Sequence, residues 1–408
     1  MIRIYTYQNG WVPSDDVLHS INLDRSGQTL VPGLQFLNWT TGRASLPWLH
    51  HLLSPNLSGV SIDFTGGHTT PVNVAVIKAI PTINLKKLAF YTLRTNAEVD
   101  SALLDLVYNS KLLGSIYIQQ DFHTGDSSPS GDEVKGEREL IELESMKSIT
   151  VTFKTEPTFL PTFFNTTTFP NIQKIHIKHL SNVNWPGVHD LFDSILRSAS
   201  PRLLHALRYI SEHHGMDITP SRIQSLQGFV ALKVLRVTSL CTATRCKFFL
   251  SDSDVLAITT AMPNLVELHL GGIPCSSTVN VSINGLAALA ANCTNLMELQ
   301  IHFDVVRFIN KVLEVSGERP IPPRSTQVSC RLTHLVVGKI LLRNGLDGYW
   351  AVGTALLQIF PNLESIKHLG LYNDWGEVMR IIKVQRNVTS LMIVSRANLL
   401  VSMCLTHT

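Results

Sequence analysis

The hydrophobic residues of this chain return in a short pattern that recurs along its length. Each copy has an apolar residue, two variable positions, a second apolar residue, one variable position and a third apolar residue. Alternate residues of a β-strand share a face, so the last two apolar positions of a copy point one way and the variable residues beside them the other. The pattern therefore predicts one short strand with a buried side and an open side in each copy.

Twelve complete copies and one broken copy are found. The clearest are Leu85/Leu88/Phe90, Ile172/Ile175/Ile177, Leu232/Leu235/Val237, Leu265/Leu268/Leu270, Leu296/Leu299/Ile301 and Leu332/Leu335/Val337. Weaker copies are Leu34/Leu37/Trp39, Leu57/Val60/Ile62, Leu113/Ile116/Ile118, Met146/Ile149/Val151, Leu204/Leu207/Tyr209 and Val388/Leu391/Ile393. The copy with Leu363 and Ile366 is broken by His368. The mean period is about 29.5 residues, which is typical of a stacked repeat.

The segments between the predicted strands have the spacing of helices. One apolar stripe is formed by Val188, Leu191, Phe192, Ile195 and Leu196, and a helix is expected to begin after Ser251. Further helices are expected over residues 349–360 and 377–385. Pro-Asn pairs, as at 170–171, 263–264 and 361–362, precede several strands and predict turns. Strands that alternate with helices indicate an α/β fold with parallel strands and the helices on their outer side.

The segment 282–296 resembles the cysteine-containing leucine-rich repeat, in which a Gly-Leu pair opens the helix and a cysteine closes it. Gly285, Leu286 and Cys293 stand at these positions. We therefore expect a leucine-rich-repeat solenoid, a curved horseshoe with parallel strands on its concave face and helices on its convex face. In this interpretation residues 1–408 form a single solenoid of about thirteen units, with 1–30 as an N-terminal capping region and loop insertions near 121–136 and 316–329.

More loosely, the chain resembles the leucine-rich-repeat portion of F-box proteins that are abundant in mushroom-forming fungi (basidiomycetes). The segments that carry this resemblance are 30–39, 52–57 and 200–207. It implies a substrate-recognition role in a cullin-type ubiquitin ligase. An F-box typically opens with Leu-Pro and an acidic residue, whereas the Leu46-Pro47 pair lacks that residue and is expected to belong to an outer helix. The F-box is therefore not expected in this chain: either the start of the gene product is missing, or the protein is a relative without the docking module.

Composition narrows the function classes. The 408 residues include 34 basic and 31 acidic side chains, a formal charge of +3, which disfavours a nucleic-acid binder. Neither a secretory signal nor an apolar stretch of membrane-spanning length is present, so we expect a cytoplasmic or nuclear protein that does not bind membranes. The six cysteines are too sparse for a disulfide framework and are interpreted as reduced thiols.

Motifs of catalysis and metal binding are not found. Cys241 and Cys246 have no second pair nearby, and the sequence has neither a Gly-x-Ser-x-Gly nor a His-Glu-x-x-His motif. No pair of carboxylates stands out as an acid and a base. We therefore expect no enzyme, no cofactor and no metal; a hydrolase or transferase on an α/β frame is a third alternative.

A binding surface is expected where variable strand residues project from the concave sheet. The predicted binding residues are Tyr117, Lys174, His176, Lys178, Arg208, Arg236 and His269. The basic ones favour an acidic region of a protein partner, with Tyr117 as an aromatic anchor, and the histidines can make binding pH-sensitive. A solvated surface without a ligand is the alternative. The predicted function is a non-enzymatic protein-binding scaffold, the substrate-recognition region of an F-box-type ligase component, which would bind the cullin adaptor only if an F-box is supplied upstream. The alternative is a stand-alone repeat protein that binds or inhibits a partner.

Overall fold

A computed structural model describes thirteen stretches of the chain. They are residues 2–5, 31–40, 49–65, 70–123, 140–154, 159–180, 188–212, 219–239, 249–272, 280–304, 330–337, 345–368 and 375–388. The chain divides into two compact units, Met1–His213 (unit 1) and His214–Thr408 (unit 2), and each is described by itself.

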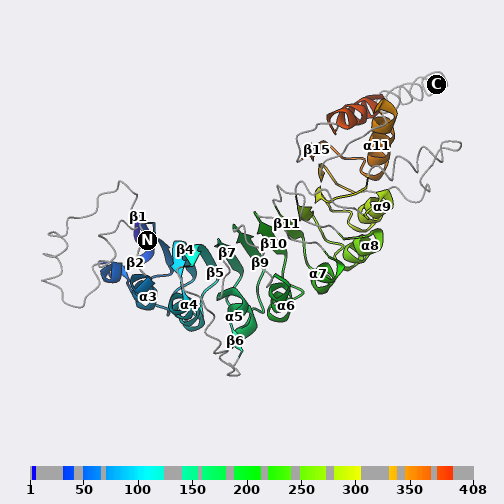
Figure 1. The fold of residues 1–408 in the computed structure, drawn as a ribbon. Coiled ribbons are helices and arrows are strands. Elements are labelled where there is room, and N and C mark those ends of the chain that lie inside the picture. The colour runs from blue at the N-terminus through cyan, green and yellow to red at the C-terminus, as the bar shows by residue number, and fades with distance from the viewer. Residues whose placement is uncertain are drawn as a thin grey trace, which may run out of the picture. The chain divides into compact units, whose positions relative to one another are not determined.

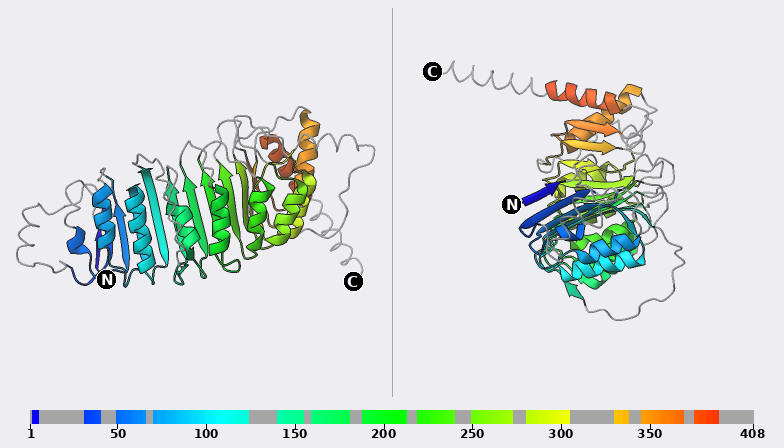
Figure 2. Two further views of the ribbon diagram at one scale, coloured as in Figure 1. Left: turned by 60° about the horizontal axis from the view of Figure 1, so that its bottom comes forward. Right: turned by 90° about the vertical axis from the view of Figure 1, so that its left-hand side faces the viewer.

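Unit 1 contains a parallel sheet with the strand order β1-β2-β3-β4-β5-β7-β9-β10 and a separate short ladder of β6 and β8. Its helices lie on one side of that sheet, and the strands run side by side in one direction (Figures 1 and 2). The strands are β1 (Ile2–Tyr5), β2 (Leu34–Thr40), β3 (Gly59–Asp63), β4 (Lys87–Thr95), β5 (Ser115–His123), β6 (Ile141–Glu142), β7 (Ser148–Phe153), β8 (Thr167–Thr168), β9 (Lys174–His179) and β10 (Ala206–Ser211). The helices are α2 (Leu49–Leu52), α3 (Thr70–Ala79), α4 (Ala97–Asn109), α5 (Phe159–Thr166) and α6 (Val188–Ser198).

Unit 2 repeats the same alternation. Its strands follow the order β11-β12-β13-β14-β15, all parallel, and α7, α8 and α9 lie on one side of β11 to β13 (Figure 1). The elements are α7 (Pro220–Gln224), the 3-10 helix η2 (Ser225–Gly228), β11 (Val234–Ser239), α8 (Asp252–Ala261), β12 (Glu267–Gly272), α9 (Ile283–Asn292), β13 (Glu298–Gln300), β14 (His334–Val337), α11 (Gly345–Ile359), β15 (Ser365–His368) and a helix over residues 375–388.

The apolar triplets form the core of each unit, as predicted. The middle apolar residues of successive copies are direct strand partners, for example Leu88 with Ile116 and Ile116 with Ile149, and each is at most 2% exposed. Burial of one such side chain contributes roughly 1.5–3 kcal/mol, so stacking many copies supplies the stability that a single copy lacks. The α/β leucine-rich-repeat fold expected from the sequence is confirmed.

Asparagine side chains link successive repeats at the turns before the strands. Asn171 Nδ2 donates to the carbonyl oxygen of Glu144 in the preceding repeat at 2.8 Å. The same bond is made by Asn56 to Pro32, Asn84 to Pro55, Asn264 to Val230 and Asn362 to Cys330. The Pro-Asn pairs therefore mark turns, as predicted, and the asparagine also satisfies a carbonyl that the turn leaves without a backbone partner.

The predicted helix signals are found at α8 and α9. Ser251 caps α8 in a capping box with Asp254, and Cys293 is the C-cap of α9, where its thiol is buried. Asp252 of α8 accepts hydrogen bonds from the amide and the hydroxyl of Ser282, the N-cap of α9, both at 2.6 Å. Hydrogen bonds thus connect the N-termini of α8 and α9.

Three details of the repeat prediction can be compared with the structure. Val388 is 46% exposed in the helix over residues 375–388, so it does not begin a further buried triplet. His368 does not interrupt its repeat, because the backbone of Ser365–His368 forms β15 in register with β14. Residues 2–5, assigned to a capping region, form a strand that pairs with β2. The rest of that region, most of the 121–136 insertion, the whole of 316–329 and Leu46-Pro47 lie outside the described residues.

In the parts of the chain that the structure describes, every helix is too short or too polar to cross a membrane.

Candidate protein-binding surface

Two rows of outward-pointing side chains cross the sheet of unit 1, and together we call them the strand face. The first row contains Lys87, Ser115, Ser148, Lys174 and Ala206, and the second contains Ala89, Tyr117, Thr150, His176 and Arg208. Consecutive members of a row are strand partners, so they are about 4.8 Å apart. Since the buried triplets point to the helices, the side chains of the strand face are those that a partner can reach.

Basic groups dominate the charge of the strand face. Lys87 and Lys174 are exposed, and neither makes an ion pair within the described part of the chain. His176 and Arg208 are half-buried and are direct partners on β9 and β10. Lys178, two residues further along β9, pairs with Glu212 at 2.5 Å, so its charge is already balanced. The two free ammonium groups are therefore the strongest attraction for an anionic partner on this face.

An aromatic pair lies further along the same strands, and we include both of its rings in the strand face. The rings of Tyr91 on β4 and Tyr117 on β5 have centroids 4.8 Å apart and are tilted by 35°. Tyr91 is 36% exposed, and the Tyr117 hydroxyl donates to Gln119 Oε1 at 3.2 Å. Burial, and then Tyr91, raise the pKa of the Tyr117 hydroxyl above its usual value of 10, against a hydrogen bond with Thr152 that lowers it. Tyr117 is thus a neutral, partly open ring at physiological pH.

A bulge in β4 sets the position of Tyr91. Phe90 pairs with Ile118 but Leu93 pairs with Gln120, so β4 has one residue more than β5 over this stretch. The extra residue is accommodated at Thr92, which has a φ of 54° and donates its hydroxyl to Asp63 Oδ1 at 2.9 Å. A β-branched residue in this left-handed region is strained. The local chain therefore departs from regular strand geometry where it presents Tyr91.

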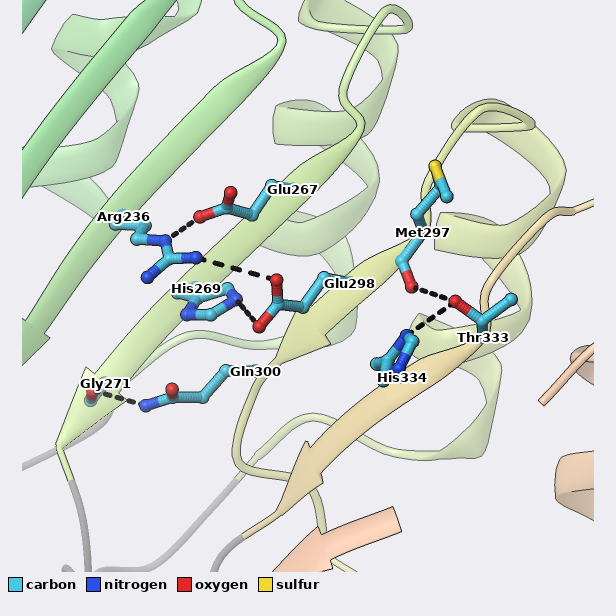
Figure 3. A network of polar contacts seen from close by, with 9 residues as sticks. All are labelled: Arg236, Glu267, His269, Gly271, Met297, Glu298, Gln300, Thr333 and His334. Atoms are coloured by element: carbon cyan, nitrogen blue, oxygen red, sulfur yellow. Dashed lines mark hydrogen bonds and ion pairs between the residues drawn. The ribbon is translucent and has the colours of Figure 1, made fainter. Parts of the chain in front are cut away.

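Arg236 in unit 2 lies between two carboxylates (Figure 3). It forms an ion pair with Glu267, and its Nη2 is 3.5 Å from Glu298 Oε2. His269 Nε2 is 3.2 Å from the other oxygen of Glu298. With two carboxylates and one guanidinium, this cluster is net negative while His269 is neutral. We call these four residues the Arg236 cluster.

Three members of the Arg236 cluster have the chemistry of metal ligands. One ligand atom from each of Glu267, His269 and Glu298 lies within 4.8 Å of the other two. Carboxylate oxygens and imidazole nitrogens are common zinc ligands. Arg236, however, already supplies the positive charge between the carboxylates, so the arrangement is that of an ion-pair network. The sequence analysis does not predict this cluster, because its two acidic residues are far apart in sequence, in consecutive repeats. The one sequence feature that could have indicated it is that Glu267 and Glu298 both stand directly before the middle apolar residue of their repeat.

The seven predicted site residues fall into two groups. Tyr117, Lys174, His176, Lys178 and Arg208 lie on the strands of unit 1, whereas Arg236 and His269 are in unit 2. The structure shows the surroundings of three of them. Lys178 and Arg236 are ion-paired, because acidic residues of neighbouring repeats come into register with them. His269 is only 5% exposed, because it packs within the Arg236 cluster. The role of all seven in binding stays a prediction. Tyr91 and Lys87 belong to the same surface, although they are not among the seven predicted residues.

Comparison with known proteins gives a distant likeness. No family model matches the chain, and no curated protein matches it. Among solved structures it is similar to the "Crystal structure of Rad7 and Elc1 complex in yeast", with a TM-score of 0.44 and 15% sequence identity over 86% of this chain and 82% of that one. At this distance the likeness gives no information on function.

Proposed function

We propose that the protein is a non-enzymatic binding scaffold whose strand face in unit 1 captures an acidic segment of a protein partner. The observation that carries this proposal is the pair of exposed lysines without ion pairs in the described part of the chain, Lys87 and Lys174, near the Tyr91–Tyr117 pair, in which Tyr91 is exposed and Tyr117 is half-buried. Their side chains have no role in the core, so their charge and ring area are available for contact.

The magnitudes favour a shared surface over a single strong contact. An exposed ion pair contributes only about 0.2–1 kcal/mol, so two lysines alone bind an acidic segment weakly. Aromatic side chains supply larger contact areas at a small entropic cost and are enriched at the energetic centres of interfaces. The combination found on the strand face is therefore suited to moderate, salt-dependent binding.

Binding is tested with a fluorescent peptide rich in Glu and Asp, titrated with the full-length protein while anisotropy is measured. The double variant Lys87→Glu/Lys174→Glu should bind about tenfold more weakly or worse, since each reversal replaces an attraction with a repulsion. Its affinity should also depend less on salt.

Lys78→Glu is the matched control, because Lys78 is exposed on α3 in the helical layer, away from the strand face. It should bind as the wild type does. Equal affinity of the double variant and the wild type would refute the proposed surface.

We also propose that the scaffold is the substrate-recognition part of an F-box-type component of a cullin ubiquitin ligase. Support comes from the resemblance of segments 30–39, 52–57 and 200–207 to that class of repeat protein. The alternative is a stand-alone repeat protein that binds or inhibits its partner. A pull-down with the purified cullin adaptor separates them: retention of the protein, expressed from its complete gene, supports the ligase role, and its absence supports the stand-alone role.

A further inference from the structure

The Tyr91–Tyr117 pair is built at an energetic cost. Thr92 has a left-handed backbone conformation, with a φ of 54°, which is unfavourable for a β-branched residue. The hydroxyl contact of Thr92 with Asp63 holds the conformation, and Asp63 Oδ1 also accepts from the amide of Thr65 at 3.0 Å. The bulge is thus fixed by the neighbouring repeat, and Tyr91 has a defined position against Tyr117.

The core does not explain this geometry. Phe90 and Leu93, on either side of the bulge, are fully buried, whereas Tyr91 is 36% exposed. Bulges commonly redirect a side chain next to a functional site. A tilted pair of half-open rings is a suitable seat for a third ring, because aromatic groups pack edge to face or offset at centroid distances of about 4.5–7 Å.

The two unpaired lysines lie on opposite sides of Tyr117 along the direction that crosses the strands. Lys87 is on β4, Tyr117 is on the next strand β5, and Lys174 is on β9 beyond β7. Three strand intervals separate Lys87 from Lys174, which is about 14 Å. An extended peptide rises about 3.3 Å per residue, so about four residues span this distance. Tyr117 lies two residues, about 6.6 Å, further along the strands than the row that contains both lysines, and Tyr91 lies four residues, about 13 Å, beyond Lys87 on β4. A chain that crosses the strands can therefore reach both lysines while an aromatic side chain between them points along the strands towards the rings.

We propose that the partner segment carries an aromatic side chain with acidic residues on both sides, and that this side chain packs on Tyr91 and Tyr117 while the flanking carboxylates pair with Lys87 and Lys174. This inference rests on the proposed function, because it specifies the acidic segment that the strand face binds. The peptide crosses the strands, so its backbone adds no strand to the sheet, and its affinity comes from side-chain contacts.

The test compares two fluorescent peptides with the full-length protein. One has the sequence Glu-Asp-Phe-Glu-Asp within a Gly-Ser frame, and the other has Ala in place of Phe. The wild type should bind the Phe peptide at least tenfold more tightly than the Ala peptide. Tyr117→Ala should remove most of this difference in affinity, and so should Tyr91→Ala. Combining the Ala peptide with either variant should therefore weaken binding little more than the Ala peptide or the variant alone does.

Control variants separate binding from folding. Tyr117→Phe keeps the ring and should retain binding of the Phe peptide within about twofold, and Lys78→Glu in the helical layer should do the same. Circular dichroism and thermal unfolding check that each variant is folded. If Tyr91→Ala is not folded, Tyr91→Phe is used as a second variant at this position.

The outcomes distinguish the two proposals. Equal binding of the Phe and Ala peptides, with sensitivity to Lys87→Glu/Lys174→Glu, would overturn the aromatic seat and leave the acidic binding surface standing. The proposed function itself would be overturned if the protein bound neither peptide, or if Lys87→Glu/Lys174→Glu left the affinity unchanged. Loss of Phe preference in Lys78→Glu to the same degree as in Tyr117→Ala would also overturn the seat, because the effect would then not belong to the rings.

Discussion

Arg236 separates two carboxylates that the repeat brings side by side. Glu267 and Glu298 are direct partners on β12 and β13, and only Arg236 among the four members of its cluster carries a permanent positive charge. Glu267 is also largely buried, with 12% of its side chain exposed. Removing the guanidinium would leave like charges adjacent in a partly desolvated place.

Arg236→Met should therefore lower the free energy of unfolding by about 2 kcal/mol, less than the loss at a fully buried pair because Glu298 is accessible to water. Glu267→Gln in the Arg236→Met background should recover part of this loss. Urea unfolding at low and high salt measures both effects, and the loss should shrink as salt screens the repulsion. An unchanged unfolding midpoint for Arg236→Met would contradict this account.

The thiol of Cys293 is predicted to be unreactive in the folded protein. Burial, and then neighbouring Cys330, raise its pKa from 9 to about 12. Iodoacetamide at pH 8 should leave Cys293 unmodified in the native protein and alkylate it in guanidinium chloride, as read by peptide mass spectrometry. Because the folded pKa lies above the unfolded one, this thiol favours folding below pH 9, and its contribution is lost as the pH rises from 9 towards 12. Rapid alkylation of the native protein would show that the site is open.

At this scale the sequence predicts positions better than interactions. The outward direction of Lys174, Lys178 and Arg236 follows from the apolar triplets. Their charge partners do not, because Lys178 and Glu212, or Arg236 and Glu298, are in different repeats and meet only when the strand register is known. Placing successive repeats in register would have revealed these pairs from the sequence.

Gly285 is required by the junction of α8 and α9. A Cβ atom at this position would lie 2.5 Å from Asp252 Oδ1 and 3.0 Å from a methyl carbon of Val281. Asp252 cannot easily move away, because both of its carboxylate oxygens accept hydrogen bonds from Ser282. The glycine of the Gly-Leu pair thus has a steric reason that lies in the preceding repeat.

Gly285→Ala should lower the stability of the protein by about 1–2 kcal/mol, although alanine usually stabilises a helix interior by about 1 kcal/mol relative to glycine. Gly228→Ala is the matched control, since a Cβ atom there meets nothing within 4 Å. Chemical unfolding of both variants gives the comparison. Stabilisation by Gly285→Ala equal to that of the control would show that the contact with Asp252 is relieved at no cost.

Helix signals and strand signals differ in how well they predict these elements. Ser251 and the acidic residues after it predict the start of α8 because capping depends on residues close in sequence. The bulge in β4 depends on pairing with β5 and on Asp63 of β3, so the sequence Lys87–Thr95 gives no local sign of it. The Tyr91–Tyr117 pair was missed for the same reason.

The stacked architecture of unit 1 predicts that damage spreads to nearest neighbours. Each strand pairs only with the strands beside it, so the stability of a repeat depends on its own packing and on two interfaces. Ile116→Ala on β5 should cost about 3 kcal/mol. Hydrogen exchange should accelerate in β4, β5 and β7 more than in β2, whereas Ser115→Ala should change little. Uniform acceleration throughout unit 1 would indicate that it unfolds as one cooperative block.

The fold as a whole is the most predictable part of this protein. The apolar triplets repeat many times, so errors at single copies, such as Val388, do not change the parallel α/β arrangement. The end repeats of the chain are harder to predict from the sequence, because terminal repeats depart from the pattern. Ile2–Tyr5, for example, form a strand without a full apolar triplet. The division into two units has no marker in the periodicity.

The fixed register of the strands gives the side chains of unit 1 a regular spacing across the sheet. Any two side chains on its rows are separated by a whole number of intervals of about 4.8 Å. Duplicating the repeat that contains β7 would move Lys87 and Lys174 apart by one interval and leave the chemistry of each unchanged. The peptide that binds most tightly should then be longer by one or two residues. Gain or loss of a repeat can thus change the preferred ligand length while the contacting residues stay the same.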